Sequence, residues 1–99
     1  DRASFPVTIV GHVGDGNFHC GLIVDTKNPA ELSEAGAINE RLVRRALAMD
    51  GTATGEHGIG SGKIKFMELE HGPSLALMKT IKHALDPLGI MNPGKVLPA

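Results

Sequence analysis

Two short runs of β-branched and apolar residues, separated by the dipeptide Asp15-Gly16, constrain the fold of this chain more than any other feature. The first run reads FPVTIVGHV and the second reads NFHCGLIVD. The Asp-Gly dipeptide readily adopts the positive φ angles of a two-residue hairpin turn. The sequence therefore predicts an antiparallel β-hairpin in which Ile9 pairs with Leu22 and His12 lies directly opposite His19.

This register divides the hairpin into two unlike faces. One face is almost wholly apolar, and we expect helices to cover it. The other face carries both histidines among small or polar neighbours, which leaves room for a ligand. A one-residue slip would move every side chain to the opposite face, so the alternation supports the register. The apolar face consists of Val7, Ile9, Val13, Phe18, Cys20, Leu22 and Val24.

A long helix is predicted after the hairpin. Asn28 and Pro29 are residue types that favour an N-cap and a first helical position, and Glu31 lies where a capping box places its acidic residue. Gly51 follows the expected end of the helix. Apolar residues recur between these points at steps of three and four, as on one face of a helix. The residues expected to face the core are Leu32, Ala35, Ile38, Leu42, Ala46 and Met49.

Two more helices are predicted in the second half of the chain. A short one is expected near residues 63–70, and a longer one runs from Gly72-Pro73 to Asp86-Pro87, where the proline ends it. The inward residues of the longer helix are expected to be Leu77, Met78, Ile81 and Leu85. The sequence therefore predicts an α+β fold, with an antiparallel hairpin-based sheet and helices packed on one face.

Composition excludes several classes of partner. The chain of 99 residues carries 10 basic and 11 acidic residues, and this balance gives no electrostatic footprint for nucleic acid.

Cys20 is the single cysteine, which favours a reducing compartment, here the cytoplasm. We expect no transmembrane segment, because no apolar run approaches the required length. The opening DRASFPVTIV enters a strand almost at once, which indicates a piece excised from a longer protein.

The two histidines and a second glycine-rich stretch suggest a metal site. His12 and His19, facing each other, could bind one divalent ion. The stretch TGEHGIGSG adds Glu56, and two histidines with one carboxylate leave coordination positions open, as in catalytic metal sites. The adjacent His57 suits proton transfer. A polar histidine pair, a turn-capping Glu56 and a solvated His57 are the alternatives. The following GIGSGK lacks the residues of a phosphate-binding loop.

Three motifs carry a resemblance to a known family. GHVGDGNFH, TGEHGIGSGK and LDPLGIMNPGKVLP, in this order, resemble the C-terminal domain of the FAD-linked oxidases related to vanillyl-alcohol oxidase. The similarity is strongest to the branch of glycolate oxidase, D-lactate dehydrogenase and D-2-hydroxyglutarate dehydrogenase. It implies that residues 1–99 are the C-terminal part of a ferredoxin-like cap domain. It also implies an FAD-binding domain that lies outside this chain.

The resemblance assigns roles to individual residues. It implies metal ligands, usually for zinc, at His12, His19 and Glu56. It further implies that His57 is the active-site base, that Asn17 contacts the substrate and that Asn92 is a candidate contact to FAD. The implied reaction oxidises a 2-hydroxy acid, such as glycolate or D-lactate, to the 2-keto acid with hydride transfer to FAD. The chain alone is expected to be inactive.

Two other functions compete with this interpretation. In a non-catalytic module, exposed sheet edges would drive homo-oligomerisation and the histidine face would bind metal incidentally. A metal hydrolase with the same ligands is disfavoured, because nothing in the chain supplies a further base and a substrate pocket without a partner domain. The expected partners of the enzyme are therefore a small 2-hydroxy acid and the FAD-binding domain of the same protein.

Overall fold

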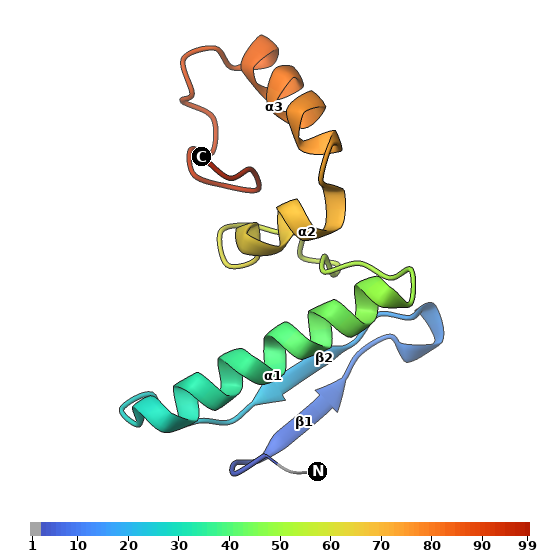
Figure 1. The fold of residues 1–99 in the computed structure, drawn as a ribbon, viewed down its shortest axis with the longest axis vertical. Coiled ribbons are helices and arrows are strands. Elements are labelled where there is room, and N and C mark those ends of the chain that lie inside the picture. The colour runs from blue at the N-terminus through green and yellow to red at the C-terminus, as the bar shows by residue number, and fades with distance from the viewer. Residues whose placement is uncertain (1–2) are drawn as a thin grey trace. The chain divides into compact units, whose positions relative to one another are not determined.

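The computed structural model describes residues 3–99, which form two compact units divided after Met49 (Figure 1). The structure confirms the predicted α+β class. The first unit contains β1 (Val7–Val10), η1 (Val13–Asp15), β2 (His19–Leu22) and α1 (Pro29–Ala48). The second unit contains η2 (Ile64–Phe66), α2 (Met67–His71) and α3 (Ser74–Leu85).

The sheet confirms the predicted antiparallel hairpin but not its register. Ile9 lies opposite Cys20 rather than Leu22, and Val10 lies opposite His19. The predicted pairing is therefore wrong by two positions along β2. Because side chains alternate with a period of two residues, this shift leaves every strand residue on its predicted face.

The start of α1 matches its sequence signals. The Asn28 side-chain oxygen accepts hydrogen bonds from the backbone N–H groups of Ala30 at 3.0 Å and Glu31 at 3.4 Å. These bonds satisfy amides that have no partner within the helix, and Pro29 occupies the first helical position. The Glu31 carboxylate accepts from the Asp25 N–H at 3.2 Å instead of closing a capping box on Asn28. It thus holds the turn that precedes the helix.

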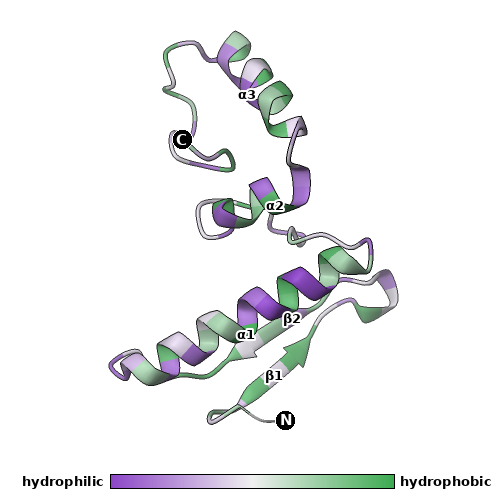
Figure 2. Ribbon diagram, viewed as in Figure 1, coloured by the Kyte–Doolittle hydropathy of each residue, from purple (hydrophilic) through white to green (hydrophobic). Residues whose placement is uncertain are grey.

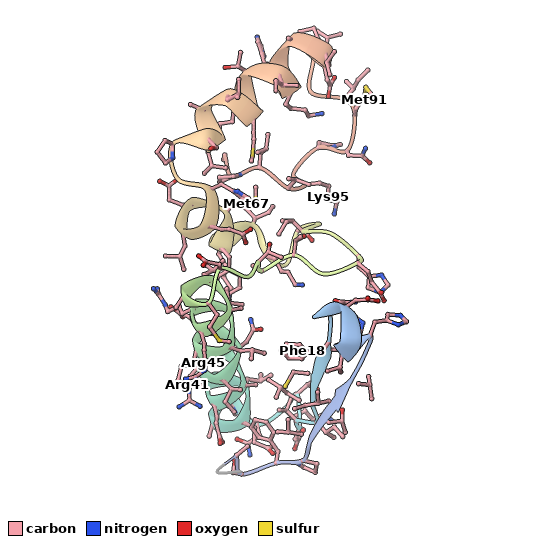
Figure 3. The ribbon with its side chains drawn as sticks, turned by 90° about the vertical axis from the view of Figure 1, so that its right-hand side faces the viewer. Phe18, Arg41, Arg45, Met67, Met91 and Lys95 are labelled. Carbon is pink, nitrogen blue, oxygen red and sulfur yellow. The ribbon has the colours of Figure 1, made fainter. Side chains whose placement is uncertain are left out.

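One helix covers the sheet only in part. α1 lies along one face of the sheet, with Phe18 pointing toward it and Arg41 and Arg45 pointing away (Figure 3). Cys20 to Leu22 of β2 are half-buried, whereas all of β1 is exposed and Ile9 is 65% exposed. The prediction that helices cover the whole apolar face is therefore wrong, since Val7, Ile9, Val13 and Phe18 are exposed.

The inward face of α1 is largely as predicted. Val43 is buried, and four of the expected residues are half-buried on the same face, namely Ala35, Ile38, Leu42 and Ala46. The predictions for Leu32 and Met49, near the two ends of the helix, are wrong because both side chains are exposed. On the solvent-exposed face of α1, the Arg44 guanidinium donates a hydrogen bond to the Glu40 carboxylate at 3.0 Å.

The core of the second unit forms where η2, α2 and the start of α3 meet. Phe66, Met67 and Leu75 are buried there, and α2 contacts α3. The predicted bounds of α3 are confirmed, but its predicted inward face is wrong for three residues. Leu77, Ile81 and Leu85 are exposed, and Figure 2 shows both apolar and polar segments along α3. Among the described helices, none combines the length and apolar character needed to cross a bilayer.

Asp86 terminates α3 and holds the segment that follows it. Its carboxylate accepts hydrogen bonds from the backbone N–H groups of Ile90 at 3.1 Å and Met91 at 2.9 Å, and from Lys82 Nζ at 2.5 Å. Lys82 also donates to the Met91 carbonyl at 2.6 Å. The hydrogen bond from Lys82, followed by those from the two amides, lowers the pKa of Asp86 from 3.8 to about 2 despite its burial.

We expect acid to destabilise this part of the chain. A carboxyl whose pKa is lower in the folded state stabilises the fold above its unfolded pKa of 3.8 and loses this effect as the pH falls toward about 2. The urea midpoint of unfolding should therefore fall across that range. Asp86→Asn should lower the urea midpoint at neutral pH, and its midpoint should change less than that of the wild type as the pH falls. Glu68→Gln, at an exposed position on α2, is the control. An Asp86→Asn midpoint that follows the wild type at every pH would contradict this role.

Candidate functional site

The connection between β1 and β2 carries His12 and Asn17, and it is longer than the predicted two-residue turn. The middle of this connection is the 3-10 helix η1, and Gly16, with a φ of 74°, ends η1. The His12 carbonyl accepts hydrogen bonds from the backbone N–H of Asp15 at 2.9 Å and of Asn17 at 3.2 Å. These local bonds explain the longer loop, because they pair amides within the connection itself. Asn17 is half-buried.

His12 and His19 are not opposed across the sheet, so that prediction is wrong. His19 begins β2 opposite Val10, and His12 follows the end of β1. Just before His12, a Cβ placed on Gly11 would lie 2.6 Å from the Phe18 Cα, so the two backbones approach too closely there for a side chain at position 11. Both imidazoles belong to the loop end of the hairpin, and both residues are exposed.

Glu56 and His57 occupy the central positions of a tight turn in the second unit. The Gly58 N–H donates to the Gly55 carbonyl at 3.1 Å, and Gly58 has a φ of 77°, which favours glycine. The stretch is thus an ordered loop, as its glycine content predicts. Adjacent central positions let both side chains project from the turn, and both residues are exposed.

The turn places a carboxylate directly beside an imidazole. Glu56 Oε1 lies 3.2 Å from His57 Nε2, and the His57 side chain is 80% exposed. A carboxylate oxygen can bind a divalent metal ion. An imidazole nitrogen can accept a proton from a substrate near neutral pH. The arrangement can therefore combine a metal ligand and a proton acceptor at adjacent residues.

The predicted site residues are divided between the two units. The first unit carries His12, Asn17 and His19, and the second carries Glu56, His57 and Asn92. Within the second unit, Glu56 and His57 lie side by side. The convergence of these two sets on one metal ion stays a prediction.

Asn92 lies in the tail just beyond the segment that Asp86 holds. Its φ is 48°, a left-handed conformation that asparagine adopts more readily than most residues. The residue is exposed. Its contact to FAD stays a prediction.

Sequence reasoning missed two carboxylates that organise these loops, Asp86 and Glu70. Glu70 accepts hydrogen bonds from the Thr52 hydroxyl at 2.6 Å and the Ala53 N–H at 2.7 Å. Burial raises the pKa of Glu70, but these bonds and the nearby His71 outweigh it and lower the pKa below its ordinary value of 4.5. The position of Asp86 at a helix end and before a proline could have indicated that its carboxylate binds nearby backbone amides. The sequence around Glu70 contains no such signal, because its hydrogen-bond partners lie far away in the sequence.

Comparison with known families establishes the relationship of the chain. A family model described as FAD linked oxidases, C-terminal domain, matches residues 1–96. The chain belongs to this family. The match confirms the resemblance that the three motifs carry, and it includes both the hairpin and the Glu56–His57 turn.

Several relatives of this FAD-linked oxidase domain are named as hydroxy-acid oxidoreductases. The chain is 56% identical, over 90% of its length, to the probable mitochondrial D-lactate dehydrogenase of Danio rerio. It is 48% identical, over 99% of its length, to the mitochondrial cytochrome D-lactate dehydrogenase of Arabidopsis thaliana. It is 37% identical, over 87% of its length, to the glycolate oxidase subunit GlcD of Bacillus subtilis.

The chain spans only 18% of the length of each of these three relatives. The names of the first two place those proteins in mitochondria. The cytoplasmic location expected from the single cysteine therefore stays a prediction.

Proposed function

We propose that this chain is the substrate- and metal-binding segment of a flavin-dependent oxidoreductase that oxidises a 2-hydroxy acid to the 2-keto acid. The observation that carries the proposal is the Glu56–His57 pair, 3.2 Å apart on an exposed turn of an FAD-linked oxidase domain. The names of the relatives support glycolate, D-lactate or a similar acid as the substrate.

The proposed metal ligands are His12, His19 and Glu56, with zinc as the metal. Two imidazoles and one carboxylate match the donor set of catalytic zinc sites, which keep a position open for substrate. All three residues are exposed. Zinc, when bound, would supply Lewis acidity that lowers the pKa of the substrate hydroxyl.

His57 is the proposed proton acceptor. Its exposed imidazole takes the proton of the substrate hydroxyl, while the α C–H bond of the acid breaks. FAD, when bound, would supply the acceptor for the departing hydride. The half-buried Asn17 amide both donates and accepts hydrogen bonds, which suits a contact to the acid. Asn92 is proposed as a minor contact to FAD.

The proposed partners are the small hydroxy acid and an FAD-binding domain of the same protein. Since the chain spans 18% of the length of the two D-lactate dehydrogenases compared above, the proposed FAD-binding domain would hold most of the cofactor. The described residues alone are therefore expected to bind zinc weakly and to catalyse nothing.

A non-catalytic dimerisation module is the second candidate function. The observation that favours it is β1, an edge strand whose four residues are all exposed, including Ile9 and Val10. An exposed edge strand with apolar side chains can pair with a second copy. Sedimentation velocity of the chain over a concentration series should show a dimer if this function holds.

The proposed reaction is tested by flavin reduction in the full-length protein. Anaerobic addition of D-lactate or glycolate should bleach the visible absorbance of the oxidised flavin, because hydride transfer reduces it. Propionate, which has the carboxylate but no 2-hydroxyl group, should leave the spectrum unchanged. A spectrum that none of several 2-hydroxy acids alters would contradict the proposed function.

A further inference from the structure

Glu70 of α2 ties down the segment that leads into the Glu56–His57 turn. The Glu70 side chain is only 14% exposed. Its Oε1 accepts from the Ala53 N–H at 2.7 Å, and its Oε2 accepts from the Thr52 hydroxyl at 2.6 Å. Hydrogen bonds to an ionised acceptor are stronger than those between neutral groups, so this carboxylate holds both donors firmly.

Thr52 carries the constraint further along the chain. While its hydroxyl donates to Glu70, the same oxygen accepts from the Thr54 N–H at 3.2 Å. The next residue, Gly55, provides the carbonyl that closes the turn with the Gly58 N–H. The segment directly before the turn is thus held by Glu70, either directly or through Thr52.

The other end of the glycine-rich loop has an anchor of its own. The Gly60 carbonyl accepts from the Val96 N–H at 2.7 Å. Val96 has a φ of 64°, an unfavourable conformation for a β-branched residue that the surrounding structure must impose. The loop is therefore fixed at both ends, while the turn between them is exposed.

We infer that Glu70 is a positioning residue, which orients the Glu56–His57 turn for metal binding and proton transfer. The inference rests on the proposed function, because it gives Glu70 a role toward the proposed ligand Glu56. Glycines allow many backbone conformations, so the turn depends on hydrogen bonds at its ends for a fixed orientation. A turn that must first become ordered binds its ligand more weakly than a preorganised one.

The inference is tested in the full-length protein by two measurements that require no turnover. Calorimetric titration with zinc, after metal removal, measures affinity, and amide hydrogen exchange without metal measures the order of the turn. Glu70→Ala should weaken zinc binding about 10-fold or more and should speed exchange at the Gly58 amide. Glu70→Gln keeps one carbonyl oxygen that can accept from the Ala53 N–H but loses the charge and the second acceptor, so it should restore only part of both. Glu68→Ala, an exposed residue on the same helix, is the matched control.

The outcomes separate this inference from the proposed function. Wild-type zinc affinity and wild-type exchange in Glu70→Ala would overturn the positioning role. Faster exchange throughout α3 as well as the turn would also overturn it, because Glu70 would then act on global stability. If Glu70→Ala does not fold, Thr52→Val replaces it and should give a smaller change in the same direction. Unchanged zinc affinity in Glu56→Gln would contradict the metal site, while faster Gly58 exchange in Glu70→Ala would still support positioning of the turn.

Discussion

Replacing His57 with alanine in the full-length protein is expected to lower turnover of the 2-hydroxy acid by about 10²-fold or more. A positioned general base contributes an acceleration of this order, and alanine leaves no group to accept the hydroxyl proton. The effect should appear in kcat and in kcat/KM alike, because the proton is transferred in the transition state rather than in substrate binding. Steady-state kinetics with D-lactate or glycolate provides the measurement.

The surroundings of His57 supply the controls for this prediction. His83→Ala removes another exposed histidine, in the last turn of α3, and should leave turnover near the wild-type value. Zinc affinity of His57→Ala should change much less than its turnover, since His57 is not a proposed ligand. Undiminished turnover in His57→Ala would end its assignment as the base.

Glu56→Gln is expected to weaken zinc binding by about 10²-fold or more. Changes to groups that only support metal ligands already cost 10- to 100-fold in affinity, so loss of a charged ligand should reach or exceed about the upper value. The amide is nearly isosteric with the carboxylate, and the turn is closed by backbone atoms of Gly55 and Gly58, so the loop should keep its shape. Calorimetric titration of the metal-free protein with zinc checks this result.

The other two proposed ligands extend the same experiment. His12→Ala and His19→Ala should each lose zinc affinity, whereas His83→Ala should retain it. These variants also test convergence, because the three proposed ligands come from both units of the chain. Equal zinc affinity in wild type and His12→Ala would remove His12 from the site and with it the two-histidine interpretation.

The sequence by itself determined those elements whose signals lie within a few residues of the feature they specify. Asn28 and Pro29 begin α1 as predicted, because a cap bonds to amides two and three residues away. Gly72-Pro73 and Asp86-Pro87 bracket α3 for similarly local reasons. Period-two alternation likewise assigned the strand residues to their faces, although the pairing differed by two positions.

The folded structure decided two kinds of feature that the sequence patterns did not specify: the length of the hairpin loop and the contacts that join distant parts of the chain. Hydrogen bonds around η1 lengthened the loop and placed Val10, rather than His12, opposite His19. The bonds from Thr52 and Ala53 to Glu70 span 17 or 18 residues, and no periodicity or cap encodes them. Such contacts depend on how complete elements pack against one another, so they emerge only when the chain has folded.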